Sequence, residues 1–244
     1  VHYLPPYRGE TKIELSELLG LPVSELHGHK SAELMFAVAE MREVKGPEEI
    51  EALERAFQIG YIMHVTAMKM CRPGVVEREI AGAIEGFAKS YGQGVSFPSI
   101  VSQHGETLHN LNCDGVLEEG RLLLVDAGGE SVEGYCSDHT RTYPVSGRFT
   151  DRQREIYEIV LAAHDLMPQI VKPGMMYNDI HRAAYLSLAE GLRAAGLING
   201  SAEDAVEAGA MYMFMPHGLG HGIGMDVHDC ENMGCLLYTS DAAD

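Results

Sequence analysis

Positively charged residues are scarce in this sequence. Lysine and arginine together total 18, against 36 aspartates and glutamates, which gives a formal net charge of −18 at pH 7. A surface with this charge balance repels the phosphate backbone of nucleic acids and anionic lipid headgroups. We therefore expect neither nucleic acid nor a membrane as a partner.

Paired cysteines and long apolar segments are also lacking. The 5 cysteines form no Cys-x-x-Cys pair, no apolar run reaches the length of a membrane span, and no signal peptide is recognisable. Reduced thiols in a cytoplasmic protein are the simplest interpretation.

The chain of 244 residues, with an apolar content of 45%, is long enough to build a sizeable core. Because it begins with valine, we expect a fragment of a longer protein. Residues 1–46 are too short for a domain of their own and are predicted to be the end of an N-terminal domain and a linker.

Two similar helix pairs are predicted about a hundred residues apart. In each pair, a turn made of a basic residue, proline and glycine joins the helices, around Pro73 and Pro173. The four predicted helices are residues 46–71, 76–92, 150–170 and 178–196. The first has one apolar face, made of Ile50, Leu53, Phe57 and Tyr61. The likeness indicates an internal repeat of helix, turn, helix and strands, although any two helix pairs resemble each other.

The segments between the helix pairs are rich in β-branched and apolar residues and are bounded by glycines, which is typical of strands. They are residues 95–110, 121–130 and 134–147. A helix pair, a run of strands and a second helix pair favour an α+β fold with an antiparallel sheet.

Two aspartates lie in these strands. Asp126 ends an apolar strand, where a charge is unfavourable, and Asp138 lies in the next strand. If the hairpin is centred near Val132, the two side chains face each other, and like charges in that position are destabilising. A cation is then expected between them: an arginine (Arg121 or Arg141), a shared proton, or a pair of metal ions about 3.5–4 Å apart.

The stretch "HGLGHGIGMDVHD", residues 217–229, holds His217, His221 and His228. Its glycines make a helix costly, so a strand or loop with room for a ligand is expected. By itself His109, alone on its predicted strand, would be a structural histidine. The histidines within predicted helices, which include His64, are assigned no chemistry.

Three features follow one another along the chain: the aspartate at a strand end, the motif "SDHTRTYPV" and the histidine-rich stretch. In these features the chain resembles the pita-bread metallopeptidases of the creatinase/aminopeptidase superfamily. The subgroup most similar is aminopeptidase P and prolidase, and the segments "EMREVKGPEEIEALERA" and "SFPSIVSQHGETLHN" share this resemblance. It covers about residues 41–234. It implies the pita-bread fold, with two pseudo-symmetric halves, each built of two helices and strands, around an antiparallel sheet.

The resemblance also implies a site. Asp126, Asp138 and His221 match three of the five side chains that hold two metal ions in that family. His217 and His228 match histidines that contact substrate, and His109 matches one that binds or shuttles a proton near the scissile carbonyl. A set rich in carboxylates suits Mn²⁺ first, with Co²⁺ or Zn²⁺ as alternatives.

The implied reaction is that of a metal-dependent exopeptidase. A hydroxide that bridges the metal ions would attack the carbonyl of the bond before proline, so the expected partner is a peptide with proline at its second position. Relatives of this kind imply a homodimer or homotetramer for the parent protein.

The sequence departs from the family after residue 234. The family would continue into strands that supply two glutamate ligands, whereas residues 235–244 contain no glutamate and do not resemble it. We expect residues 47–234 to be a C-terminally truncated catalytic domain, residues 235–244 to be an artefactual tail, and the chain to be poorly active. The alternatives are a non-catalytic pita-bread module that binds a peptide or protein, a methionine-aminopeptidase-like hydrolase and a creatinase-like hydrolase.

Overall fold

The computed structural model describes residues 1–230, which divide into two compact units, residues 1–45 together with Cys230, and residues 46–229. Within these described residues, no helix is both long and apolar enough to cross a membrane. The predicted tail, residues 235–244, lies outside the described part. The predicted domain boundaries stay predictions.

The first unit is helical. Its elements are α1 (Gly9–Leu19), α2 (Val23–Leu26), the 3₁₀ helix η1 (His27–His29) and α3 (Ala32–Glu43). The hydroxyl of Tyr3 donates to the carbonyl oxygen of Leu26 over 2.6 Å, and both residues are buried. This contact ties the start of the chain to the end of α2.

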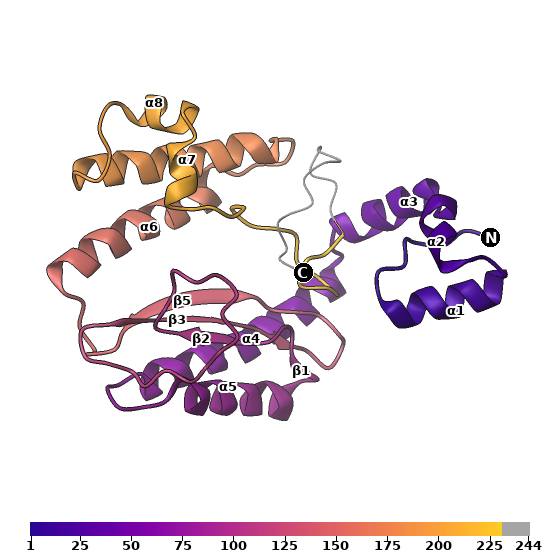
Figure 1. Ribbon diagram of the computed structural model, residues 1–244, viewed down its shortest axis with the longest axis horizontal. Helices are drawn as coiled ribbons and strands as arrows, with labels where there is room; N and C mark the ends of the chain where they lie inside the picture. The colour runs from indigo at the N-terminus through magenta and orange to yellow at the C-terminus, as the bar shows by residue number, and fades with distance from the viewer. Residues whose placement is uncertain (231–244) are drawn as a thin grey trace. The chain divides into compact units, whose positions relative to one another are not determined.

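The second unit begins with a helix pair and strands and continues with a second helix pair (Figure 1). Its elements are α4 (Pro47–Met70), α5 (Glu77–Tyr91), β1 (Gly94–Val95), β2 (Ile100–Ser102), β3 (Leu122–Ala127), β4 (Gly129–Glu130), β5 (His139–Pro144), α6 (Asp151–Ile170), α7 (Tyr177–Ala194), α8 (Ala202–Glu207) and the 3₁₀ helix η2 (Ala210–Met213). All strand pairs are antiparallel, in a three-stranded sheet of order β2-β3-β5 and a two-stranded sheet of β1 and β4. The predicted α+β class is confirmed.

The helix starts follow local sequence signals. The N–H of Gly46 donates to Oε2 of Glu49 over 2.8 Å at the start of α4, with Pro47 as its first residue. Thr150 and Gln153 cap each other at the start of α6. The turns that follow α4 and α6 are alike, since Gly74 and Gly174 both have a φ of 87°. Only glycine adopts such a φ without strain.

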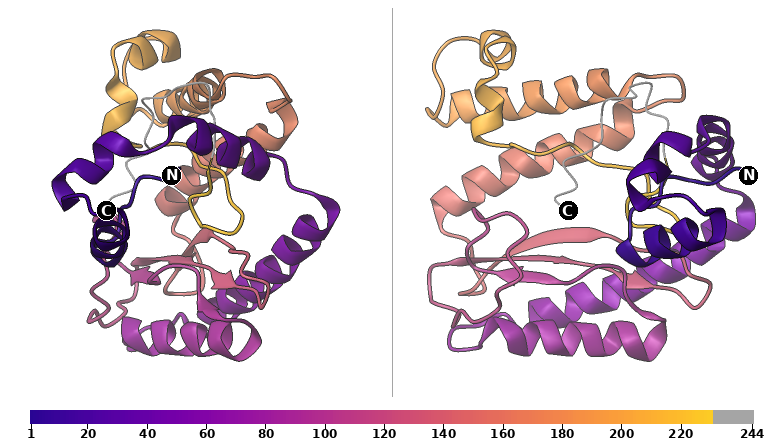
Figure 2. Two further views of the ribbon diagram at one scale, coloured as in Figure 1. Left: turned by 90° about the vertical axis from the view of Figure 1, so that its right-hand side faces the viewer. Right: turned by 45° about the vertical axis from the view of Figure 1, so that its right-hand side comes forward.

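Helices α4 and α5 cover one face of the three-stranded sheet (Figures 1 and 2). The core between them includes Met63 of α4, Ile84 of α5 and Val125 of β3, all fully buried. A separate core joins α6, α7 and α8 around Leu188, Leu192 and Met211. Within the described residues, no strand follows α7, so strands of the predicted second half are not seen there.

The predicted apolar face of α4 is not the face that it buries. Of its four residues only Leu53 is buried, while Ile50 and Tyr61 are 46% and 64% exposed. The buried face is made of Ala52, Leu53, Ala56, Ile59, Gly60, Met63, His64 and Ala67. Its small residues let the helix approach the sheet closely: a Cβ on Gly60 would lie 2.8 Å from Nδ1 of His139. The backbone of α4 at Gly60 therefore lies directly against the side chains of His139 and Ser137.

Candidate metal centre

The two aspartates lie diagonally across the β3–β5 ladder. Asp126 pairs with Thr140, and Ala127 pairs with His139, so Asp138 lies just before β5. The expectation that the aspartates face each other directly is wrong, because the hairpin is centred one residue later than predicted. The intervening Gly129–Glu130 pairs with β1, and Glu130 also bridges Cys136 across the hairpin in the same antiparallel register. Diagonal neighbours on one face are still within reach of each other's side chains.

Strand alternation places Asp126 on the face opposite the core. Leu123, Val125 and Ala127 are fully buried members of the core that α4 and α5 cover, while the residues between them are partly buried. Asp126 therefore projects from the other side of the sheet. This explains how a charged residue can end an otherwise apolar strand.

The carboxyl of Asp126 has an unusual environment. Burial, and then the nearby charge of Asp138, raise its pKa from 3.8 to about 6, and the hydroxyl of Thr140 opposes this shift. Its Oδ1 atom is buried and has no hydrogen-bond partner among the described residues. Such an oxygen is costly unless a cation or a proton occupies the site.

Neither arginine supplies that cation. Arg121 lies 3.8 Å from Glu118, and Arg141 donates to the carbonyl oxygen of Thr140 over 2.7 Å. Of the expected cations, a shared proton and metal ions remain.

His221 completes the group. Its Nε2 lies 3.1 Å from Oδ2 of Asp138, and its Nδ1 lies 2.9 Å from the carbonyl oxygen of Gly222. A carbonyl only accepts, so Nδ1 carries a proton, and the contact with Asp138 then needs a further proton on one of the two partners. A neutral imidazole with this tautomer presents the Nε2 lone pair to the carboxylates, as a metal ligand does.

The glycine-rich segment is a loop that is fixed on both sides of His221. The hydroxyl of Tyr177 donates to the carbonyl of Gly220 over 2.9 Å and accepts from its N–H over 3.0 Å. On the other side, the N–H of Cys136 donates to the carbonyl of Gly224 over 2.8 Å, only two residues before Asp138. These bonds bring two segments far apart in the sequence to one site.

The other predicted histidines are placed differently. His228 stacks on His221, with ring centroids 3.7 Å apart and an interplanar angle of 13°. His217 is exposed, and its Nδ1 lies 2.8 Å from the carbonyl of Gly218. His109 lies in an exposed loop, with a φ of 51°, and not on the predicted strand, since β2 ends at Ser102. Among the described residues, no hydrogen bond or ion pair links His109 or His217 to the aspartates.

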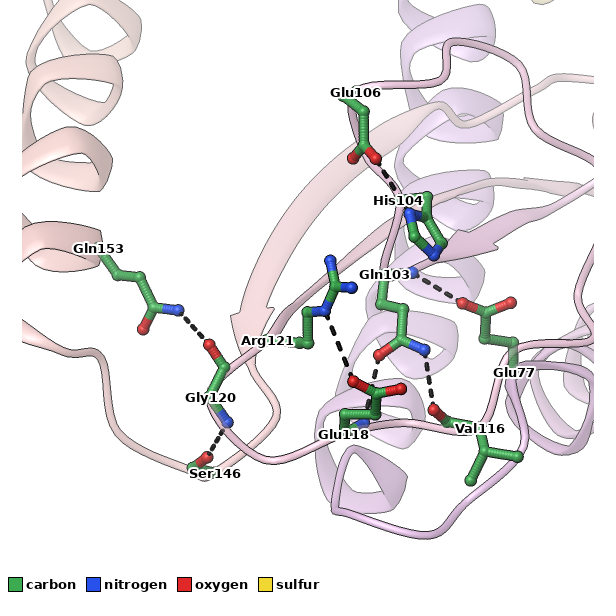
Figure 3. A network of polar contacts seen from close by, with 10 residues as sticks. All are labelled: Glu77, Gln103, His104, Glu106, Val116, Glu118, Gly120, Arg121, Ser146 and Gln153. Carbon is green, nitrogen blue, oxygen red and sulfur yellow. Dashed lines mark hydrogen bonds and ion pairs between the residues drawn. The ribbon is translucent and has the colours of Figure 1, made fainter.

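The loop that carries His109 is held at its ends by buried groups (Figure 3). Glu77, only 2% exposed, accepts from the N–H of Gln103 over 2.8 Å and from that of Gly115 over 3.0 Å. The side chain of Gln103 adds bonds to the backbone of Val116 and Glu118. These groups fix both ends of the segment between residues 103 and 115.

The donor types of this site fit a divalent metal. Within the described residues, no group of three or more His, Cys, Asp or Glu side chains forms a ready-made metal cluster. Two carboxylates and an imidazole nevertheless converge, one carboxylate oxygen has no partner, and a proton is needed between Asp138 and His221. A divalent cation would satisfy all of these groups and displace the shared protons.

Sequence reasoning missed one polar residue close to this site. His64, on the buried face of α4, lies behind the sheet and contacts the backbone next to both aspartates. The sequence signal for this residue was its position one helical turn after Gly60, on a helix face made of small residues.

Comparison with known proteins gives concordant matches. The model of Metallopeptidase family M24 matches residues 51–241, and so reaches into the segment predicted to be a foreign tail. A probable Xaa-Pro aminopeptidase (PEPP) of Coccidioides posadasii strain C735 is 40% identical over 204 residues, which are 80% of this chain and 43% of that protein. The chain therefore spans less than half the length of this curated relative.

Solved structures match as well. Aminopeptidase PepP of Pseudomonas aeruginosa superposes with a TM-score of 0.83 at 28% identity, over 95% of this chain and 54% of that chain. A zinc-substituted Escherichia coli aminopeptidase P in complex with product gives a TM-score of 0.73 at 35% identity, over 80% of this chain and 44% of that chain. These matches confirm the expected pita-bread fold, here truncated relative to the matched proteins.

Proposed function

Since the chain belongs to metallopeptidase family M24, we propose that it carries part of the catalytic unit of a metal-dependent exopeptidase that hydrolyses the peptide bond before proline. The observation that carries this proposal is the convergence of Asp126, Asp138 and His221, with the protonated Nδ1 of His221 directed at a backbone carbonyl. The relatives named Xaa-Pro aminopeptidase support the substrate class.

In this proposal Asp126, Asp138 and His221 are ligands of two divalent metal ions. Carboxylate oxygens and an imidazole nitrogen suit Mn²⁺, with Co²⁺ or Zn²⁺ as alternatives. When bound, such ions act as Lewis acids and lower the pKa of the attacking water. The two further glutamate ligands that the resemblance implies have no match in residues 47–234, so we propose weak metal binding and slow hydrolysis for this chain.

The remaining histidines act on the substrate in this proposal. His228 stacks against His221 at the site and is suited to contact the bound peptide. His217 and His109 would hold the oxyanion and pass a proton to the leaving nitrogen of proline, since imidazoles near neutrality serve both roles. The substrate is a peptide with proline at its second position, whose free amino group binds near the metal ions. Homodimer or homotetramer assembly of the parent protein and a cytoplasmic location also remain predictions.

The proposal is tested by metal binding and hydrolysis in parallel. Free Mn²⁺ is measured by electron paramagnetic resonance during titration of the chain, and Ala-Pro-Ala, Met-Ala-Ala and creatine are offered with and without EDTA. Wild-type chain should bind Mn²⁺, and D126N and H221A should weaken binding at least about tenfold. The matched control is D165N, on the exposed face of α6, where the Asp165 side chain is 60% exposed.

Each outcome is decisive. Slow hydrolysis of Ala-Pro-Ala that EDTA abolishes supports the assignment. No Mn²⁺ binding at millimolar concentration rejects the metal site and favours a non-catalytic module. Preferred cleavage of Met-Ala-Ala contradicts the substrate class, and metal-independent turnover of creatine indicates a creatinase-like enzyme.

A further inference from the structure

A buried histidine lies behind the sheet that carries the two aspartates. His64 is 5% exposed and belongs to α4, on the face that packs against β3 and β5. Its Nε2 lies 2.8 Å from the carbonyl oxygen of His139 and 3.4 Å from that of Ala127, and its Nδ1 lies 2.6 Å from the hydroxyl of Tyr143. Both ring nitrogens therefore have partners.

These partners fix the form of the ring. Carbonyl oxygens only accept, so Nε2 carries the proton and donates to them. Burial lowers the pKa of His64, which keeps the ring neutral. Nδ1 then accepts from the hydroxyl of Tyr143. One imidazole thus joins α4 to both strands through defined donors and acceptors.

The two carbonyls belong to a cross-strand pair next to the proposed ligands. Ala127 pairs with His139 in the ladder; Ala127 directly follows Asp126, and His139 directly follows Asp138. We infer that His64 is a positioning residue that holds the backbone after both carboxylates in register. This inference rests on the proposed function, because it concerns the geometry of the proposed metal ligands.

Close packing around His64 favours this role. A Cβ on Gly60, one turn earlier on α4, would lie 2.9 Å from Oγ of Ser137. A Cβ on Gly129 would lie 2.3 Å from Cγ2 of Ile59. The backbone of α4 at Gly60 therefore lies against the side chain of Ser137, and the backbone of β4 at Gly129 lies against the side chain of Ile59. An apolar side chain at position 64 would fill the space but leave the two carbonyls without this donor.

The test separates positioning from packing. H64L removes the donor and acceptor, H64Q restores an N–H donor at nearly the same place, and M63A opens a cavity at the neighbouring, fully buried core residue of the same helix. Thermal unfolding of each variant in EDTA gives its loss of stability. Hydrogen–deuterium exchange of residues 122–130 and 136–145 is then compared in EDTA, and Mn²⁺ affinity is measured by paramagnetic resonance.

H64L should speed exchange in both segments and weaken Mn²⁺ binding about tenfold, the lower end of the effect typical of groups that orient metal ligands. H64Q should recover most of both properties. M63A should leave both near wild type at a comparable loss of thermal stability. If H64L fails to fold, Y143F, which removes only the hydroxyl partner, should give a smaller change in the same two segments.

Equal exchange in H64L and M63A, or no recovery in H64Q, overturns the inference and leaves His64 a packing residue. A wild-type chain that binds no Mn²⁺ rejects the proposed function instead, and the exchange comparison still decides the role of His64.

Discussion

Replacing Asp126 with asparagine should stabilise the metal-free chain at neutral pH. The carboxyl of Asp126 is partly buried beside Asp138, and these two causes raise its pKa from 3.8 to about 6. Asparagine has nearly the same shape without the charge. The substitution therefore removes a repulsion that the folded chain carries only in the absence of metal.

The sign and size follow from proton linkage. The folded chain holds a proton on Asp126 up to about pH 6, whereas the unfolded chain releases it near pH 3.8. The contribution of Asp126 to stability is therefore greatest below pH 3.8, its pKa in the unfolded chain, and is lost as the pH rises from 3.8 to about 6. A shift of about 2 pKa units corresponds to about 3 kcal/mol lost from the free energy of unfolding above pH 6. For a chain of this length, a gain of about 3 kcal/mol through D126N raises the melting temperature by roughly 6–12 °C.

The assay is thermal and urea unfolding of wild type and D126N in EDTA, at pH 4 and pH 7.5. The difference should be small at pH 4 and about 3 kcal/mol in favour of D126N at pH 7.5. The control D165N should stay within about 0.5 kcal/mol of wild type, since it changes an exposed residue. Mn²⁺ at a hundred times the wild-type dissociation constant should add about 2.7 kcal/mol to wild type and at most about 1.4 kcal/mol to D126N, whose affinity is expected to be at least about tenfold lower.

Two results would refute this reasoning. A D126N chain that is less stable than wild type at pH 7.5 in EDTA would mean that the ionised carboxylate is satisfied by partners other than a proton or metal. A stability difference that is the same at both pH values would mean that Asp126 does not titrate in this window.

Three further substitutions test the supports of the site. E77A leaves the N–H groups of Gln103 and Gly115 without their acceptor and should cost about 2–4 kcal/mol in urea unfolding, with E77Q in between; unchanged stability would show that water replaces the carboxylate. Y177F removes the hydroxyl that holds Gly220 and should cost less than about 1.5 kcal/mol, yet weaken Mn²⁺ binding; unchanged affinity would show that the loop is held by other bonds. G60A places a Cβ 2.8 Å from Nδ1 of His139 and should lower stability by about 1–3 kcal/mol in thermal unfolding, although alanine favours helix. A stabilised G60A would contradict the close approach of α4.

Signals local in the sequence predicted most of the helices and strands. Pro47 and Thr150 mark helix starts, and both are seen at the expected places. Repeated apolar residues predicted β3, and the glycine-rich stretch around His221 is the expected loop. Each of these features depends on residues only a few positions apart, so the sequence pattern contains the information.

The register of the aspartates could not be predicted in the same way. It depends on where the hairpin turns, and the segment before the turn, Gly129–Glu130, is held on two sides, by Cys136 across the hairpin and by β1, which lies earlier in the chain. A shift of one residue in the hairpin centre exchanges a direct pair for a diagonal one, so a small error in the turn changes the geometry of the site. The placement of His109 failed for a related reason, because β2 ends at Ser102 and the buried carboxylate of Glu77 holds the loop that follows.

The buried face of α4 shows how a helix packs against a sheet that carries a candidate site on its opposite face. An apolar stripe of large residues predicted one face, but the buried face of the helix includes Ala56 and Gly60, and Gly60 leaves room for the side chains of Ser137 and His139. A polar residue on such a face must find hydrogen-bond partners, since burying it without them is costly. His64 finds them in the carbonyls of Ala127 and His139. In this chain, a histidine one turn after a glycine thus contacts the strand backbone that carries the candidate ligands.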